Sequence, residues 1–488
     1  MSKEITVTIK ESQGAKHIRH SVAETLLDTL QKQNIAEGSF CKGLSSCGHC
    51  KVRFVKGAPF PSVRDRQFFS PQELRQGYRL ACQAKPVQDC SVELYFVADE
   101  KLEIIAGNIL HTTVSEKYKA GEHLRITKIQ HPFIAVDIGT TTVVMQLADG
   151  ESGEVLHTVK FLNPQRSFGF DVLSRIQAAQ KQGNVLREKI VKALEQGIKQ
   201  LQKEAACTEE PELLCITGNT AMLHIFMGYD TTGLGKSPFS VFHLACEETV
   251  FCGIRTVLMP SVSAFVGADV TAGIWESKMQ ESDKITLLLD LGTNGEMALG
   301  NREKILTCAA AAGPAFEGGL TEGVYGADIL GAIALLLEQG IIDESGYMEQ
   351  TNSCVYRSKK VEITLEKVRE IQLAKAAIRA GIELLTEKYG LSSYEEIDKV
   401  HLAGGFGFFL DPAVAVRTGL LPKELEKKAK PVGNSALAGA VSFGKAYWKD
   451  AGKARHFFHT DKIESFNLAG EKEFQEKFIN NMNFPQSH

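Results

Sequence analysis

Four cysteines within the first hundred residues have the spacing of ligands to a metal centre. Three of them stand close together in Cys41-Lys-Gly-Leu-Ser-Ser-Cys47-Gly-His-Cys50, and Cys82 follows in a separate segment. Thiolates bind iron–sulfur clusters and structural zinc, and the two glycines of this segment let a short loop turn tightly around several sulfur atoms. We therefore predict that these four cysteines hold one metal centre.

An Asp-x-Gly-Thr turn occurs twice, as Asp137-Ile-Gly-Thr140 and Asp290-Leu-Gly-Thr293, about 150 residues apart. Each copy follows an apolar strand and precedes a second strand. Glycine lets backbone N–H groups approach phosphate oxygens, threonine adds hydroxyl donors, and aspartate holds Mg²⁺ or orients an attacking water. A repeat of this length predicts two similar lobes with a cleft between them.

Further turns of small residues lie in the same region. Leu214–Thr220 and Val400–Gly407 form a second matching pair, each an apolar strand that ends before a helix. For Asp269 and Glu317 the sequence leaves two roles open: each either contacts nucleotide or metal, or caps a helix. His224 lies in an apolar stretch, which favours a buried core histidine over a catalytic base.

Local patterns predict the elements that position these residues. Residues 4–10 alternate as a strand does, and Ser21-Val-Ala-Glu24 has the pattern of a capping box at a helix start. Strands are also predicted at Lys51–Val55 and Ser91–Val97. Farther along, Gly433–Gly439 opens a helix and either packs or faces phosphate.

Composition excludes several classes of protein. Of 488 residues, 43% are hydrophobic and 23% charged, and the formal net charge of −4 argues against a nucleic-acid partner. The apolar runs are shorter than the ~20 residues of a membrane helix, and the N-terminus has no apolar signal core. We therefore expect a cytoplasmic protein that binds no membrane, whose eleven cysteines are metal ligands or buried side chains and not disulfides.

The order of strand, helix, cysteine loop, strand and late cysteine resembles the β-grasp domain of plant-type [2Fe–2S] ferredoxins. The ligands that this resemblance implies are Cys41, Cys47, Cys50 and Cys82. The first interval between them holds five residues where the plant-type pattern has four. A four-thiolate zinc site is the alternative, although paired C-x-x-C knuckles would be usual there. His49 and Cys90 are not expected to be ligands.

The repeated turns resemble those of the acetate kinase, sugar kinase, heat-shock chaperone and actin superfamily, which binds ATP between two lobes. There the Asp-x-Gly-Thr turns contact phosphate, and a later Gly-Gly turn holds adenosine. By this resemblance, Asp137 and Asp290 manage Mg²⁺ and the attacking water. The residues expected to contact ATP are Gly139, Thr140, Thr141, Thr142, Gly292, Thr293, Asn294, Gly295, Gly404, Gly405 and Gly407.

The order of the modules resembles that of the reductive activators of corrinoid enzymes. The motifs that carry this resemblance are Gly218-Asn-Thr-Ala-Met222, Phe265-Val-Gly-Ala-Asp269, Ala311-Ala-Gly-Pro-Ala-Phe-Glu-Gly318 and His401-Leu-Ala-Gly-Gly-Phe-Gly407. It implies an ATP-hydrolysing oxidoreductase that passes one electron from the [2Fe–2S] cluster to a corrinoid protein. That electron would return cob(II)alamin to cob(I)alamin for a methyltransferase or O-demethylase system. It also implies an unidentified low-potential electron donor and allows a homodimer.

We therefore predict a multidomain protein of the α+β and α/β classes, with a β-grasp ferredoxin-like domain before a duplicated, two-lobed, actin-like ATPase fold. The first domain is expected at residues 1–98, and a linker, or a reduced form of the middle domain of long family members, at 99–131. The ATPase is expected at 132–450, with lobes at about 132–285 and 286–450. A C-terminal tail is expected at 451–488.

Three other functions are open to such a chain. One is a small-molecule kinase with a redox-sensing ferredoxin domain. Another is an activator of a different radical or low-potential enzyme, such as a 2-hydroxyacyl-CoA dehydratase, although those activators hold a [4Fe–4S] cluster between subunits and have no separate cysteine module. The third is an actin-like scaffold, which would have no use for a ferredoxin domain.

Overall fold

The computed structural model of the chain describes residues 3–11, 14–33, 35, 50–69, 71–94, 131–169, 171–292, 294–316, 324–458 and 462–486. The chain divides into two compact units, residues 1–103 with 162–191 and residues 104–161 with 192–488. Among the described helices, none is both long and apolar enough to cross a membrane.

The N-terminal sheet has the strand order β2-β1-β5-β3-β4, in which β1 and β5 are parallel. Its elements are β1 (Glu4–Glu11), β2 (Gly14–Ser21), α1 (Leu26–Lys32), β3 (Lys51–Lys56), α2 (Asp65–Phe68), α3 (Pro71–Arg75), β4 (Tyr78–Leu80) and β5 (Cys90–Leu94). Leu26 and Leu30 of α1 are buried with Val7, Val52 and Val92 of the strands. This is the ferredoxin-like arrangement that the sequence predicts.

Helix α1 begins later than the sequence predicts. The capping box is formed by Thr25 and Asp28, whose backbone N–H groups donate to each other's side chains at 3.0 and 3.2 Å. Ser21, the predicted cap, is instead the last residue of β2 and lies opposite Glu4 of β1. The local capping pattern is overridden because β1 and β2 pair along their full length.

The first lobe of the repeated region is built on the sheet β10-β11-β9-β6-β7-β8. Its strands are β6 (Pro132–Ile138), β7 (Thr142–Asp149), β8 (Val155–Leu162), β9 (Leu213–Gly218), β10 (Glu247–Phe251) and β11 (Ile254–Leu258). The helices in this part of the chain are η1 (Pro164–Phe168), α4 (Val172–Gln182), α5 (Val185–Glu204), α6 (Thr220–Met227), η2 (Gly233–Gly235), α7 (Ala268–Glu276) and η3 (Met279–Glu281). β6 is buried along almost its whole length, as expected for an apolar strand inside a sheet.

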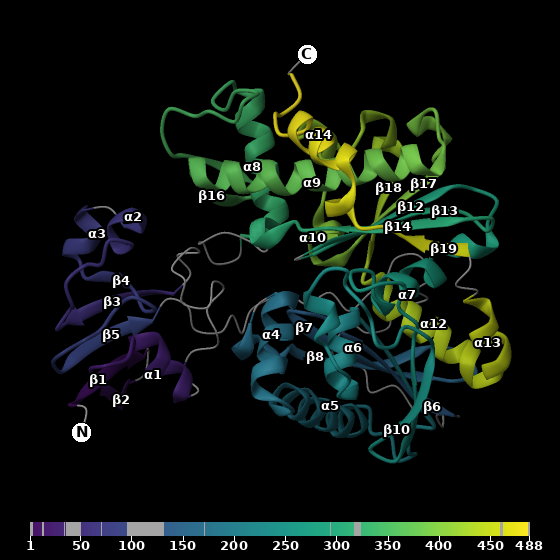
Figure 1. Cartoon of the computed structure of the whole chain (residues 1–488), viewed down its shortest axis with the longest axis horizontal. Coiled ribbons are helices and arrows are strands. Elements are labelled where there is room, and N and C mark those ends of the chain that lie inside the picture. Colours follow the sequence, from purple (N-terminus) through teal and green to yellow (C-terminus); the bar gives the residue numbers. More distant parts are fainter. Residues whose placement is uncertain are drawn as a thin grey trace. The chain divides into compact units, whose positions relative to one another are not determined.

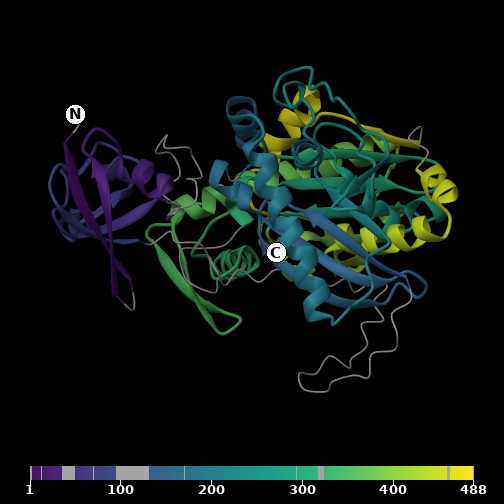
Figure 2. The ribbon, with the colours of Figure 1, turned by 90° about the horizontal axis from the view of Figure 1, so that it is seen from below.

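The second lobe is built on the sheet β18-β17-β12-β13-β14-β19. Its strands are β12 (Thr286–Leu291), β13 (Gly295–Gly300), β14 (Ile305–Ala310), β17 (Lys399–Ala403), β18 (Ala429–Gly433) and β19 (Ile463–Ser465). The helices are η4 (Gly313–Phe316), α8 (Gly326–Glu338), α9 (Leu365–Tyr389), η5 (Tyr394–Glu396), α10 (Gly404–Phe409), α11 (Pro412–Arg417), η6 (Lys423–Lys428), α12 (Ser435–Lys449), α13 (Ala451–Phe457), η8 (Leu468–Gly470) and α14 (Lys472–Asn480). A hairpin of β15 (Asn352–Tyr356) and β16 (Lys359–Ile363) projects from this lobe, in green in Figure 2.

The two sheets repeat one pattern of strand pairing. β6 pairs antiparallel with β7 and parallel with β9, just as β12 pairs antiparallel with β13 and parallel with β17. β11 then extends the first sheet in parallel, and β18 extends the second. The duplication is therefore confirmed. It includes the second predicted pair of turns, which lie between β9 and α6 and between β17 and α10.

Helices α7 and α12 lie between the two sheets of this two-lobed domain (Figure 1). α7 follows β11 of the first sheet and contacts β12 and β13 of the second, whereas α12 follows β18 of the second sheet and contacts β6 and β9 of the first. At their crossing, a Cβ atom on Gly439 would lie 2.1 Å from the carbonyl oxygen of Ala272. The two helices therefore join the lobes through a contact that only glycine permits.

The last described residues belong to the second lobe, although the sequence after Trp448 contains no recognisable motif. β19 pairs parallel with β14, and α14 packs on α9. An ion pair of 2.9 Å joins Lys388 of α9 to Glu471. Lys375, which is only 1% exposed, donates a hydrogen bond to the backbone oxygen of Asn483. The C-terminal segment is thus held along α9.

Candidate nucleotide and metal-centre sites

The first Asp-x-Gly-Thr turn joins β6 to β7. The carboxylate of Asp137, near the end of β6, accepts a 2.9 Å hydrogen bond from Asn434 Nδ2. A Cβ atom on Gly139 would lie 2.6 Å from a carbonyl oxygen three residues on, so the turn requires glycine. Thr140 accepts a 2.9 Å hydrogen bond from Asn219 Nδ2. The remaining predicted residues are Thr141 in the turn and Thr142 at the start of β7.

The second turn joins β12 to β13 in the same way. Asp290 is the second-last residue of β12, the backbone N–H of Gly292 donates to the backbone oxygen of Asn294 at 2.9 Å, and β13 begins at Gly295. A Cβ atom on Gly292 would meet no atom within 4 Å. This turn therefore borders open space. The predicted contact residue Thr293 lies outside the described residues.

The Gly-Gly turn lies directly beside the second Asp-x-Gly-Thr turn. Gly404 has a φ of +80°, and a Cβ atom on it would lie 2.4 Å from Oδ1 of Asp290. At Gly405 a Cβ atom would meet nothing within 4 Å, whereas at Gly407 it would lie 3.2 Å from the backbone of Leu402. Gly404 thus lets the carboxylate approach the backbone, Gly405 borders open space, and Gly407 packs against β17.

Four buried carboxyl groups lie close enough to influence one another's charge. Burial raises the pKa of Asp137 to about 6, although the hydrogen bond from Asn434 lowers it. Burial and the charge of Asp137 raise the pKa of Asp290 to about 7. Burial, followed by the charges of Asp290 and Asp137, raises the pKa of Asp269 to about 8. Burial raises the pKa of Glu296 well above its usual value, and the charges of Asp269 and Asp290 add to the effect.

A cation bound here would take one or two of these carboxylates and its remaining ligands from nucleotide and water. Asp269, in the first turn of α7, lies near the turn carboxylates Asp137 and Asp290, and its contact with nucleotide or metal stays a prediction. Glu317 lies outside the described residues. No group of three or more His, Cys, Asp or Glu side chains within the described ranges could hold a metal ion. Mg²⁺ characteristically uses one or two carboxylates together with phosphates and water. The open space beside Gly292 and Gly405 is where such phosphates could lie.

Sequence reasoning missed the two asparagines that brace the first turn. Asn219 Oδ1 accepts from the backbone N–H of Met222 at 2.9 Å and caps α6, and Asn434 Oδ1 accepts from Leu437 at 2.8 Å and caps α12. The amide nitrogen of each side chain then reaches the first Asp-x-Gly-Thr turn. A sequence signal was present, because Gly-Asn-Thr-Ala begins at Gly218 and Gly-Asn-Ser-Ala at Gly433.

Glu296 was also missed as a site residue. It lies in β13 directly opposite Asp290 of β12 in the sheet register. Its position after the second turn could have indicated this, because residues directly opposite each other in an antiparallel pair of strands lie on the same face of the sheet.

Two of the four predicted cluster ligands converge in the N-terminal sheet. The Sγ atoms of Cys50 and Cys82 lie 3.2 Å apart, and the two residues are 3% and 4% exposed. This separation is much longer than the ~2.05 Å of a disulfide, so the pair consists of two thiols. Two thiols brought together from distant segments fit a shared metal centre. Cys41, Cys47 and His49 lie outside the described residues.

Cys90 is a buried side chain of the N-terminal core. Burial and the neighbouring charge of Asp89 raise the pKa of its thiol to about 12. That Cys90 is not a cluster ligand stays a prediction.

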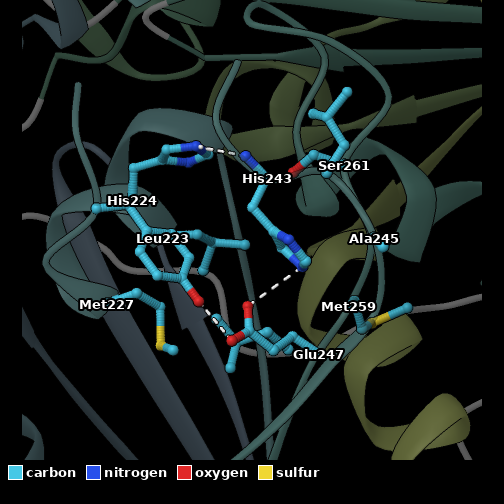
Figure 3. Close-up of a pocket in the computed structure, with 11 residues that line it drawn as sticks. Leu223, His224, Met227, His243, Ala245, Glu247, Met259 and Ser261 are labelled. Carbon is cyan, nitrogen blue, oxygen red and sulfur yellow. Dashed lines mark hydrogen bonds and ion pairs between the residues drawn. The ribbon is translucent and has the colours of Figure 1, made fainter. Parts of the chain in front are cut away.

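His224 is confirmed as a core histidine with its hydrogen bonds satisfied. It is 3% exposed, Nδ1 lies 2.7 Å from the backbone oxygen of Thr220, and Nε2 accepts from the backbone N–H of His243 at 3.4 Å. Burial lowers its pKa. Figure 3 shows the small pocket beside it, where Glu247 accepts a hydrogen bond from Tyr229 and lies 3.2 Å from His243. Both nitrogens of His224 are thus engaged, so the ring is not placed as a base.

Three models of known protein families match successive parts of the chain. A model of the 2Fe-2S iron–sulfur cluster binding domain matches residues 10–87, and a model of the C-terminal domain of RACo, the ASKHA domain, matches residues 284–322 and 319–488. A model of the RACo middle region matches residues 133–282. The class is therefore an iron–sulfur domain joined to a two-lobed ASKHA domain. Both RACo models match this chain, which is therefore similar to RACo proteins in its middle and C-terminal regions.

Individual relatives carry related names. The corrinoid activation enzyme RamQ of Eubacterium limosum is 33% identical over 379 residues, which span 63% of this chain and 63% of that protein. The [Co(II) methylated amine-specific corrinoid protein] reductase of Methanosarcina barkeri is 24% identical over 62% of this chain and 68% of its own. A solved structure of a reductive activator for corrinoid, iron–sulfur protein aligns over 99% of both chains with a TM-score of 0.64 and 27% identity.

The position of the middle region differs from our expectation. We expected it to be reduced to residues 99–131, but its model matches residues 133–282. That range includes β6 to β11 and α7 of the first lobe. The middle region of this family is therefore present in this chain and includes the first Asp-x-Gly-Thr turn.

Proposed function

We propose that this chain uses ATP to reactivate a corrinoid protein, whose cobalt is reduced by one electron from Co(II) to Co(I) for a methyltransferase system. The observation that carries the proposal is the presence in one chain of a converging pair of thiols and a duplicated cleft with Asp137 and Asp290 at equivalent turns. Relatives named as corrinoid activators align with 63% and 99% of this chain.

The ATP half of the reaction is assigned to the cleft. Backbone N–H groups and hydroxyls of the two turns would bind phosphate, and Mg²⁺ would neutralise the facing carboxylates together with the phosphates. Asn434 holds Asp137 in place through its 2.9 Å hydrogen bond, and Gly404 lets Asp290 lie against the backbone. Hydrolysis converts ATP and water into ADP and phosphate, with one of these aspartates orienting the water.

The redox half is assigned to the N-terminal domain. The residues that would hold the [2Fe–2S] group are Cys41, Cys47, Cys50 and Cys82. When bound, this group would carry one electron, and its reduction potential in plant-type domains is roughly −400 mV. Burial of Cys50 and Cys82 keeps water from their sulfur atoms.

ATP is needed because the family resemblance implies a cobalt couple more negative than this potential. Each ~100 mV uphill costs about 2.3 kcal/mol per electron. Nucleotide can offset this cost only if it favours a state of the chain that binds the corrinoid protein differently. A nucleotide that contacts both Asp-x-Gly-Thr turns would favour closure of the lobes about the contact between α7 and α12, and hydrolysis would release it.

An anaerobic assay tests this function. The full chain is mixed with Ti(III) citrate and candidate corrinoid proteins, with and without ATP, and the Co(I) spectrum is followed. ATP-dependent Co(I) formation is expected, with ATP hydrolysis stimulated by the corrinoid protein. Stoichiometric phosphorylation of a small acceptor, with no Co(I) formed from any corrinoid protein, would identify a kinase instead.

A further inference from the structure

The loop between β3 and α2 holds a phenylalanine out in the solvent. Phe60 is 99% exposed and Val63 is 75% exposed, the two highest values among the large hydrophobic side chains of the described residues. Phe60 stands between Pro59 and Pro61. Because proline fixes its own φ and restricts the residue before it, the backbone on both sides of Phe60 has little freedom.

Two buried charged side chains hold this loop in place. Arg79 is 5% exposed, and its Nε donates to the backbone oxygen of Pro59 at 2.9 Å. Asp65 is 1% exposed and accepts from the backbone N–H groups of Ser62 and Leu80, each at 2.7 Å. Single exposed apolar side chains are common, but the backbone on either side of this one is tied to β4, the strand that leads to Cys82.

The segment that contains this loop, residues 50–94, carries an excess of positive charge. Residues 50–94 contain eight Lys or Arg and four Asp or Glu, whereas the whole chain has 55 and 59. Two of the four acidic residues pair with Lys51 and Arg53 of β3, and Asp65 is buried. Lys56, Arg64 and Arg66 flank Phe60 and are exposed, and no acidic side chain among the described residues forms an ion pair with them.

We propose that residues 56–66 are the docking site for the electron donor, an acidic redox protein with an apolar recess that receives Phe60. This inference rests on the proposed function, because it names the protein that supplies the electron. An aromatic side chain that fills a pocket of the partner at the centre of a contact is often an affinity hot spot. The surrounding cations steer an acidic partner and increase its rate of association.

The sign of the charge favours the donor over the corrinoid protein. The reduced donor carries one more negative charge than the oxidised donor. A cationic loop therefore binds the reduced donor more tightly than the oxidised donor that remains after electron transfer. A corrinoid protein gains negative charge when it is reduced, so the same loop would retain the product. The charge of this loop therefore promotes release of the partner after electron transfer only if that partner is the donor.

The test uses the full chain purified anaerobically with its cluster, and a small acidic ferredoxin as the probe. Binding of the labelled, oxidised probe is measured by fluorescence anisotropy, and bleaching of the chain's visible spectrum by the reduced probe is measured by stopped flow. We expect Phe60→Ser to weaken binding about tenfold or more. We expect Arg64→Glu with Arg66→Glu to slow reduction by a similar factor at low ionic strength, and salt to remove that difference.

Matched controls separate docking from folding. Phe242→Ser changes another exposed phenylalanine, which is 67% exposed, and Lys16→Glu changes an exposed charge on β2 at the opposite edge of the sheet. Both should behave as the wild type. Ti(III) citrate, which needs no docking site, should reduce every variant at the wild-type rate. Co(I) formation driven by this reductant reports on the proposed function independently of the donor.

Two results would overturn the inference. One is unchanged probe binding and unchanged reduction by the probe in both Phe60→Ser and the charge variant. The other is normal probe binding combined with slower corrinoid reduction by a chain that Ti(III) citrate has already reduced, because the loop would then face the corrinoid protein.

Discussion

Adjacent glycines in the Gly-Gly turn should respond oppositely to the same substitution. In Gly404→Ala the new Cβ atom would start 2.4 Å from Oδ1 of Asp290 on a backbone with a φ of +80°. An alanine in the left-handed region costs about 1–2 kcal/mol, and forced overpacking costs about 1–3 kcal/mol. We therefore expect a loss of roughly 2–5 kcal/mol in the free energy of unfolding. We also expect a fall in kcat for ATP hydrolysis of about a hundredfold, because Asp290 is displaced.

Gly405→Ala is the matched control. A Cβ atom there meets nothing within 4 Å, and the position lies inside α10, where alanine is favoured over glycine by about 1 kcal/mol. The variant should be at least as stable as the wild type. If adenosine or phosphate occupies the open space, its KM for ATP should rise while kcat changes little.

Denaturant unfolding of the full chain and steady-state ATPase assays measure both effects. The reasoning is refuted if Gly404→Ala keeps wild-type stability and wild-type ATP turnover. It is equally refuted if Gly405→Ala is as unstable as Gly404→Ala, because the structure places no neighbour at that position.

Three further variants test other contacts. Asn434→Ala should raise the pKa of Asp137 and reduce ATPase kcat/KM by an amount equivalent to about 1.5–3 kcal/mol. Asn434→Ser, which can still cap α12, should regain helix stability but not activity, as thermal melting and kinetics would reveal. Because burial and neighbouring charge raise the folded-state pKa of Asp269, the folded state holds its proton longer than the unfolded state. Stability of the nucleotide-free chain should therefore fall as the pH rises from about 4 to 8, and Asp269→Asn should flatten that pH dependence in denaturant titrations. Cys82→Ser should abolish the visible spectrum of the cluster, whereas Cys90→Ser should keep it.

The duplicated cleft could be predicted because its signals are local. An apolar strand followed by Asp-x-Gly-Thr predicts both a buried strand and a tight turn, and the spacing of two copies predicts two lobes. The pairing of β6 with β7 and of β12 with β13 follows from adjacent segments of chain. The Gly-Gly turn was found for the same reason.

The missed contacts depend on residues far apart in the sequence. An asparagine before a helix predicts a cap, and both asparagines are caps. Their second hydrogen bonds, however, join Asn219 to a residue 79 positions away and Asn434 to one 297 positions away. Only the packing of α7 and α12 between the sheets brings Asn434 to Asp137. The start of α1 was mispredicted because strand pairing competes with capping at Ser21.

The central claim is that ATP hydrolysis in the cleft drives reduction of a corrinoid protein. Its most direct test is Co(I) formation by Asp290→Ala and the wild type in parallel anaerobic reactions with ATP, Ti(III) citrate and a corrinoid protein. The account predicts that Asp290→Ala keeps the visible spectrum of the cluster but forms no Co(I) above the level without ATP. ATP-dependent Co(I) formation by Asp290→Ala at the wild-type rate would contradict it.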